Sequence, residues 1–260
     1  KELIVAMKVR YPLWKAVLDR MKALPAILFV VFLCLMLVIV FINVYRYRQV
    51  VQAQRAILLA LAALTEFRDV FTGKHLERAR NYAMVLAKQL RKNPKYKKII
   101  TDEFVDDLYN AAPLHDIGKV ATPDSILLKK GKLDDEEYEK MKGHVLIGKH
   151  LLQDVIDTFN IKESFVIMAR DICAYHHERW DGTGYTEGLA TEEIPLAARI
   201  FSLCDAYDAI TSERVFKGQI SHKEALRRIR LARSVQFDPD VVDAFEECRG
   251  KFWEISETWK

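Results

Sequence analysis

The sequence has few cysteines, a small net charge and no segment of low complexity. Its four cysteines stand far apart without a Cys-x-x-Cys pair, which argues against a zinc finger or a disulfide framework. We expect them to be reduced residues of a core. The net charge of +4 is small for 260 residues, so the composition predicts no binding to DNA. The 50% of apolar residues suffices for one sizeable core and an appendage.

The chain also lacks alternating apolar and polar runs bounded by turns, so it predicts no β-sheet. Helix-like segments follow one another instead, separated by signals such as Asn93-Pro94, where the proline stops a helix. The predicted fold class is therefore all-α. The expected helices cover residues 74–92, 101 to near His115, a segment from 133 that carries His144, and then 162–176, 195–211, 222–232 and 239–251.

One long hydrophobic run is present, from Ala23 to Ile42, with twenty residues and no charge. Twenty helical residues rise about 30 Å, which matches the hydrocarbon core of a bilayer. We predict one transmembrane helix over residues 23–43. A buried core helix is the weaker interpretation, and a signal peptide fits worse because its apolar region is shorter. Residues 1–22 are expected to be a juxtamembrane segment that ends a missing N-terminal region.

Residues 44–66 form a predicted connecting helix without helix breakers. Val50, Ile57 and Leu64 recur every seven residues, but two heptads are too few to assign a coiled coil. Two interpretations stay open, a homodimer through this helix and a helix that packs only on its own domain.

His115 and Asp116 stand side by side at the end of an apolar, helix-like run. A single pair is a weak signal, but five of the seven histidines fall within or at the ends of predicted helices, at wide intervals. Metal ligands that a helical bundle brings together are spaced in this way. Neutral imidazoles and carboxylates suit Zn, Fe or Mn, and a carboxylate beside a histidine can bridge two ions. The five are His75, His115, His144, His176 and His177.

An ordered set of short motifs runs through the remainder of the chain. The set comprises Arg68-Asp69 before Thr72-Gly73-Lys74-His75, then His115-Asp116-Ile117-Gly118-Lys119, His144 with Gly148, residues 176–185 (HHERWDGTGY), Asp205-Ala206-Tyr207-Asp208-Ala209 and Thr211-Ser212-Glu213-Arg214. From about Glu66 to Phe252 the chain resembles the HD-GYP branch of the HD hydrolase superfamily, bacterial phosphodiesterases that open cyclic di-GMP. The resemblance implies an HD-type helical bundle, which we assign to residues 67–260.

The resemblance also implies a site with two divalent ions, of iron or manganese. One ion would be held by His75, His115, Asp116 and Asp205, and the other by Asp116, His144, His176 and His177, so that Asp116 bridges. The ions would supply a hydroxide near neutral pH, and Lys119 would neutralise charge on the phosphate, unless it is a surface lysine. The implied substrate contacts are Asp69, Asp181, Tyr185, Asp208, Arg214 and Lys217, although Arg214 and Lys217 also fit a solvated basic face.

The implied function is a membrane-anchored phosphodiesterase that converts cyclic di-GMP to the linear dinucleotide pGpG. Two alternatives stay open: an HD phosphohydrolase for another cyclic nucleotide, such as cyclic GMP-AMP, and a catalytically silent receptor. More basic residues precede the span than closely follow it, so the positive-inside rule taken literally places the C-terminal domain outside, and we set it aside. Because cyclic dinucleotides are cytoplasmic in the resembling enzymes, we expect a single-pass protein of the inner membrane with its catalytic domain in the cytoplasm.

Two positions depart from the family pattern. Thr186 stands where the family has proline, and we expect a more mobile loop, with uncertain consequences for substrate preference or docking of a diguanylate cyclase partner. Phe71 stands four residues before His75, where some relatives use a glutamate to hold a third ion. A phenyl ring offers no ligand atom, so we predict two ions and hydrolysis that stops at the linear dinucleotide.

Overall fold

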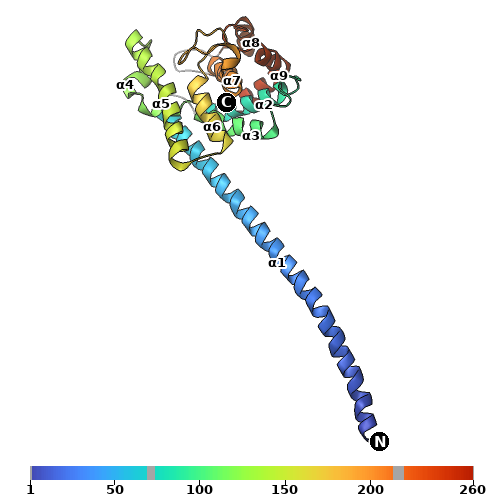
Figure 1. Ribbon diagram of the computed structural model, residues 1–260. Helices are drawn as coiled ribbons and strands as arrows, with labels where there is room; N and C mark the ends of the chain where they lie inside the picture. The colour runs from blue at the N-terminus through green and yellow to red at the C-terminus, as the bar shows by residue number, and fades with distance from the viewer. Residues whose placement is uncertain (1, 69–73, 213–219, 260) are drawn as a thin grey trace. The chain divides into compact units, whose positions relative to one another are not determined.

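Helices make up the regular structure of the chain, which confirms the all-α prediction (Figure 1). The computed structural model describes residues 2–68, 74–212 and 220–259, and within them no strand occurs beyond an isolated bridge between Arg233 and Phe237. The α-helices are α1 (Glu2–Arg68), α2 (Lys74–Leu90), α3 (Asp102–Ala111), α4 (Asp124–Leu127), α5 (Asp135–Phe159), α6 (Ser164–Tyr175), α7 (Leu196–Thr211), α8 (His222–Leu231) and α9 (Pro239–Thr258). Short 3-10 helices are η1 (Ala112–Leu114), η2 (Ile117–Ala121) and η3 (Thr191–Glu193).

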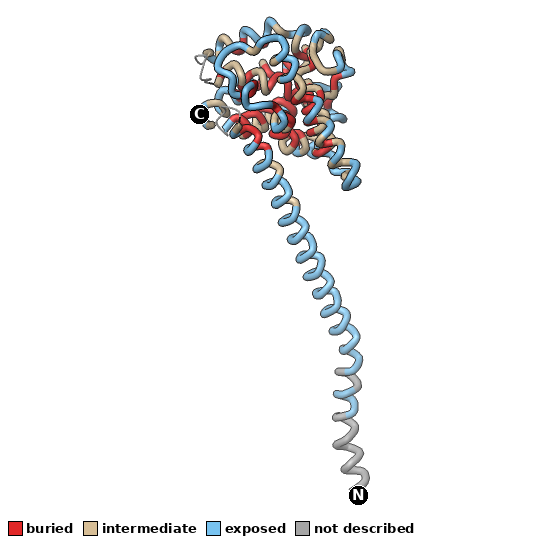
Figure 2. The backbone as a smooth tube through the Cα atoms, turned by 90° about the vertical axis from the view of Figure 1, so that its left-hand side faces the viewer, coloured by how far each residue is buried: buried red, intermediate tan, exposed pale blue. Residues whose placement is uncertain are grey.

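The chain divides into two compact units, residues 1–56 and 57–260. The described part of the first unit lies within α1, and its apolar residues from Leu24 to Tyr45 are exposed (Figure 2). By length and composition, the stretch within Leu24–Arg68 is able to cross a membrane. None of its most apolar window is buried, so it is not a core helix of the described chain.

The second unit contains the core, with α2 packed against α3, α7 and α9. Apolar residues of α2 recur at helical spacing from Leu76 to Leu90 and bury one face of the helix. Tyr82 on that face stacks on Phe252 of α9, with ring centroids 4.6 Å apart, and meets Tyr207 of α7 edge to face. The remaining helices α5 and α6 pack on each other, and η2 lies against α5.

Most helix ends lie where local sequence signals predict them. Thr101 caps α3 by accepting a hydrogen bond from the Phe104 N–H, and Asp134 forms a capping box with Glu137 at the start of α5. One prediction needs correction, because α3 does not extend to the neighbourhood of His115. Pro113 has no N–H to continue the α-helical ladder, and the chain passes through η1 instead.

Candidate metal centre

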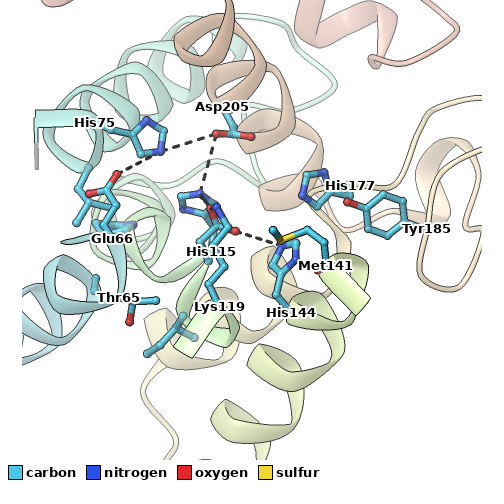
Figure 3. A pocket seen from close by; sticks show the side chains of 15 residues that line it. Thr65, Glu66, His75, His115, Lys119, Met141, His144, His177, Tyr185 and Asp205 are labelled. Atoms are coloured by element: carbon cyan, nitrogen blue, oxygen red, sulfur yellow. Dashed lines mark hydrogen bonds and ion pairs between the residues drawn. The ribbon is translucent and has the colours of Figure 1, made fainter. Parts of the chain in front are cut away.

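A pocket in the second unit collects side chains from several helices (Figure 3). Its walls come from the last turns of α1, from α2, α5 and α7, and from the segments around η1 and η2. The loop after α6 closes one side. The lining residues used below are Glu66, His75, His115, Asp116, Lys119, His144, His177, Tyr185 and Asp205.

His75, His115 and Asp205 form what we call the first cluster. They come from α2, the end of η1 and α7, and their nearest ligand atoms all lie within 4.8 Å of one another. The Asp205 Oδ1 atom lies 3.8 Å from Nε2 of His75 and 4.0 Å from Nε2 of His115. Both histidines are buried. Nitrogen and oxygen atoms gathered at this spacing are able to hold one cation.

His144, His176 and His177 form the second cluster, again with ligand atoms within 4.8 Å of one another. His144 lies on α5, whereas His176 and His177 follow the last residue of α6. Adjacent residues within a helix point about 100° apart, so two neighbouring histidines reach one ion only where the helix ends. The sequence predicted such an end at this pair, and α6 does end at Tyr175.

Asp116 lies between the two clusters. Its Oδ2 atom is 3.0 Å from Nε2 of His115, and its Oδ1 atom is 3.2 Å from Nε2 of His144 and 3.9 Å from Nε2 of His176. Each carboxylate oxygen therefore faces a different cluster. This is the placement that a bridging carboxylate requires.

The close packing of η2 on α5 brings Asp116 to His144, and two glycines permit it. A Cβ atom on Gly118 would come within 1.9 Å of the His144 carbonyl oxygen, so any side chain there would force the segments apart. Gly148, one turn after His144, lies against the same segment. The pairing of His-Asp-x-Gly with His144 and Gly148 in the sequence is thus a steric requirement of the site.

Three of the ligand histidines have one ring nitrogen engaged by a backbone carbonyl. Nδ1 donates to the Ala112 carbonyl in His115 (3.0 Å), to the Met141 carbonyl in His144 (2.6 Å) and to the Ile172 carbonyl in His176 (2.9 Å). A neutral imidazole then carries its lone pair on Nε2, the atom that faces the pocket. These Nε2 atoms and Oδ1 of Asp116 are buried without a hydrogen bond.

Lone pairs of nitrogen and carboxylate oxygen that face one another at 3 to 4 Å repel unless a proton or a metal ion lies between them. Buried polar atoms without partners are rare in folded proteins and call for an explanation. The residues present therefore fit a metal ion in each cluster. His150 and His222 lie elsewhere, as expected, since His150 is exposed and His222 accepts or donates at the Tyr207 hydroxyl.

Charges in the centre shift the pKa values of its groups strongly. Burial disfavours the charged form of His115, but the adjacent Asp116 carboxylate outweighs it and raises the pKa to about 9. Burial and, to a smaller extent, neighbouring His115 lower the pKa of His176 to about 4. Despite burial, His115 and Lys119 hold the pKa of Asp116 well below its usual range. A metal ion must therefore displace a proton from His115, while His176 is neutral and ready to bind.

Asp208 supports the first cluster from behind. Its buried carboxylate accepts from Nδ1 of His75 at 2.6 Å and from two guanidinium nitrogens of Arg78, at 2.6 and 2.9 Å. Burial opposes ionisation, but the hydrogen bond from Arg78 lowers the pKa of Asp208 to about 2. We predicted Asp208 as a substrate contact, and this needs correction, because a fully buried carboxylate with these partners is not available to a substrate.

Known proteins and a known family are similar to the larger part of this chain. A family model described as HD domain matches residues 60–241. The chain belongs to the HD domain family. It is 44% identical to a probable cyclic di-GMP phosphodiesterase of Vibrio cholerae, over 78% of this chain and 46% of the relative. It is 37% identical to a cyclic di-GMP phosphodiesterase of Thermotoga maritima, over 73% of this chain and 48% of the relative.

A third relative is named for a different dinucleotide. It is a 3'3'-cGAMP-specific phosphodiesterase of Vibrio cholerae, 32% identical over 77% of this chain and 36% of its own length. The chain spans about half the length, or less, of the curated relatives it matches. These matches confirm the assignment to the HD-GYP branch.

Lys119 of this HD domain lies at the pocket wall. Its ammonium group is 2.8 Å from Oδ2 of Asp116, and its side chain is 18% exposed. The alternative of a plain surface lysine does not agree with this position.

The loop that carries the HD-GYP signature is held by side chains as well as by backbone. Tyr185 stacks on His177, with ring centroids 4.9 Å apart and planes 22° apart. The Thr186 hydroxyl donates to the Ala174 carbonyl at 3.2 Å. The Glu178 carboxylate accepts from the backbone N–H groups of Glu187 and Gly188, at 2.7 and 3.0 Å. These bonds connect the loop to the end of α6 and to Glu178, and the greater mobility expected without the proline stays a prediction.

Asp181 does not line the pocket. Its carboxylate accepts from the backbone N–H and the hydroxyl of Thr183, at 3.0 and 2.6 Å, and so shapes the turn within the signature loop. The predicted substrate contacts Asp69, Arg214 and Lys217, and the departure at Phe71, lie outside the described residues.

Two groups of this centre escaped the sequence analysis. Arg78 is one, because nothing in the sequence around this arginine indicates that it hydrogen-bonds to Asp208. The other is Glu66, which lines the pocket from the last turns of α1. Burial raises the pKa of Glu66. The signal in the sequence is a carboxylate two residues before the Arg68-Asp69 motif.

Proposed function

We propose that this chain is the catalytic part of a metal-dependent phosphodiesterase that hydrolyses cyclic di-GMP to the linear dinucleotide pGpG. The observation that carries the proposal is the pair of adjacent clusters that share Asp116 in one pocket. Relatives named as cyclic di-GMP phosphodiesterases support the substrate. The whole protein's activity belongs to this proposal, because the chain spans only part of those relatives.

Two ions, of iron or manganese, would be held by His75, His115, Asp205 and Asp116 on one side and by Asp116, His144, His176 and His177 on the other. When bound, they supply a hydroxide at neutral pH and neutralise phosphate charge. Lys119 adds a positive charge beside Asp116, where it stabilises charge that develops on the phosphoryl oxygens. Tyr185 presents a ring beside His177, where it orients the substrate.

The test is incubation of the purified chain with cyclic di-GMP and with cyclic GMP-AMP, in the presence of Mn²⁺ or Fe²⁺, with products separated by chromatography. We expect pGpG from cyclic di-GMP, little further hydrolysis, and no product after chelation of the metal. Faster turnover of cyclic GMP-AMP would favour the second candidate, which the relative named for that dinucleotide supports. Tight binding without turnover by metal-loaded protein would instead identify a silent receptor.

The proposal includes a membrane anchor, with residues 23–43 as a single span and the catalytic domain in the cytoplasm. The exposed apolar stretch of α1 supports it. Fusions of alkaline phosphatase and of green fluorescent protein to the C-terminus decide the orientation. We expect fluorescence and no periplasmic phosphatase activity in the membrane fraction, and the reverse result would place the domain outside.

We also propose a homodimer through the connecting helix. Val50, Ile57 and Leu64 are 55%, 60% and 65% exposed, so the seven-residue repeat is not used within the described chain. Cysteine crosslinking at exposed Ile57 in membranes should give a dimer, whereas a monomer under all conditions would contradict it. A diguanylate cyclase domain is the further partner that we propose for the signature loop.

A further inference from the structure

Glu66 is a buried carboxylate that the proposed metal ligands do not include. It lies at the end of α1, is 9% exposed and lines the same pocket as the first cluster. Figure 3 shows its carboxylate directed toward His75, and its Oε1 atom lies 3.9 Å from Nε2 of that histidine. Neither of its oxygens has a hydrogen-bond partner among the described residues.

The distance from Glu66 to His75 is close to the distance from Asp205 to the same histidine, although Glu66 is not one of the three residues whose ligand atoms all lie within 4.8 Å of one another. Asp205 stands 3.8 Å from Nε2 of His75 and Glu66 stands 3.9 Å from the same atom. Two ligands of one ion, each bonded at about 2.0 to 2.2 Å, lie at most about 4 Å apart. Because Nδ1 of His75 is occupied by Asp208, Nε2 is the only atom of His75 that can meet a cation, and Glu66 faces that atom.

Glu66 lacks a hydrogen-bond partner within the described chain in either of its two protonation states. As a carboxylate it needs donors, and as a neutral carboxylic acid its hydroxyl needs an acceptor, but the described residues provide neither. Leaving such a group unpaired in the interior costs free energy in both states. A cation beside His75 satisfies it, and no hydrogen bond has to break for the carboxylate to turn toward that ion.

We propose that Glu66 is a direct ligand of the ion in the first cluster, together with His75, His115 and Asp205. This inference rests on the proposed metal-dependent function. Glu66 lies nine residues before His75 and belongs to the preceding helix, α1. The first ion then has three carboxylates around it, counting the shared Asp116, and the second ion has one.

The experiment compares Glu66→Gln with Glu77→Gln in the full chain in detergent. Glutamine keeps the size of the side chain and removes its charge. Glu77 is a matched control, because it lies on α2 near the site but pairs with Arg80 and is not part of the pocket. Metal-free protein is titrated with Mn²⁺, free Mn²⁺ is measured by electron paramagnetic resonance, and metal per chain is measured by elemental analysis.

We expect two bound ions in the unaltered chain and in Glu77→Gln. In Glu66→Gln, one of the two sites should weaken by at least about tenfold, as loss of a group that supports a metal does, while the other keeps its affinity. Equal titration curves for all three proteins would overturn the proposal. So would three ions in the unaltered chain and two in Glu66→Gln, because Glu66 would then hold an ion of its own.

Thermal unfolding of the metal-free proteins separates a ligand from a structural residue. Glu66→Gln should unfold at the same or a higher temperature, because the substitution removes a buried, unpaired charge. A clear fall in metal-free stability would show that Glu66 supports the fold, and would overturn the proposal. The titration contains no substrate, so a protein that binds Mn²⁺ as expected but hydrolyses no dinucleotide would contradict the proposed function alone.

Discussion

The two clusters of the pocket differ in charge and in how their histidines are held. The first cluster lies among carboxylates, with Asp205 inside it, Glu66 beside it and Asp208 behind His75. The second cluster consists of imidazoles, and its His144 and His176 are oriented by backbone carbonyls. Both clusters share the carboxylate of Asp116.

This difference determines which substitutions change the metal affinity of each cluster. A carboxylate behind a histidine orients the ring and makes it a more basic ligand, and a substitution can remove that carboxylate. A backbone carbonyl performs the same orientation, but its position depends on the helix and on the fold. We therefore expect the affinity of the first cluster to respond to single side chains, and that of the second to respond mainly to its own ligands and to the signature loop.

The largest effect is expected for Asp116→Asn, which acts on both clusters. A neutral amide cannot balance two divalent cations, so turnover should fall below detection and neither cluster should bind Mn²⁺ tightly. Turnover is measured by chromatography and bound metal by elemental analysis. Unaltered turnover in a folded variant would contradict the whole metal assignment.

Asp181→Asn is the control for that change, because it makes the same substitution on a carboxylate outside the pocket. Asparagine can still accept the hydrogen bonds from Thr183, so turnover should stay within a few-fold of the unaltered chain. A large loss of turnover would restore Asp181 as a substrate contact.

A smaller effect, confined to one cluster, is expected for Asp208→Asn. The first cluster should bind Mn²⁺ about 10- to 100-fold more weakly, and the second cluster should keep its affinity. The free energy of unfolding should fall by about 3 to 5 kcal/mol, because Arg78 would stay buried without its partner. An equal loss of Mn²⁺ affinity at both clusters would show that Asp208 does not support the first cluster alone.

The matched control for Asp208→Asn is Asp243→Asn. Asp243 also pairs with an arginine, Arg233, but its side chain is 60% exposed. Surface substitutions of this kind change stability by no more than about 0.5 kcal/mol. Chemical denaturation of the two variants without metal tests both values.

The smallest effect is expected for Thr186→Val, which acts on the second cluster through the loop. Valine keeps the branched shape but loses the hydrogen bond to the Ala174 carbonyl, at a cost of about 1 kcal/mol. Since Tyr185 stacks on His177, kcat/KM should fall by less than about tenfold. Thr186→Ser keeps the hydroxyl and should behave like the unaltered chain. A larger loss in serine than in valine would show that the hydroxyl does not position the loop.

Several features of this chain were predictable because they depend on neighbours in the sequence. Helix starts follow from residues such as Thr101 and Asp134, whose capping acts within one turn. The set of histidines that meets in the pocket was predictable because few other residues bind metals through nitrogen, and because the order of motifs resembles a known family. The end of α6 at the adjacent pair also follows from local geometry.

Other features depend on residues that only the folded chain brings together. Asp208 is 133 positions from His75, and nothing in its local sequence distinguishes a carboxylate behind a histidine from one that contacts a substrate. Thr186 likewise anchors its loop to a carbonyl twelve positions away, a bond that its identity alone does not imply.

The amino-acid sequence by itself determined the helical class, the apolar stretch of α1 and the types of ligand atoms available, because these depend on side-chain chemistry and on periodicity. Tertiary structure alone decided how the carboxylates are placed around the two clusters. Asp116 stands between the clusters because Gly118 lets η2 touch α5, and Glu66 faces His75 because folding brings the last turns of α1 and the start of α2 to the same pocket. Distances of 3 to 4 Å between residues far apart in the chain are set by packing, which no local pattern encodes.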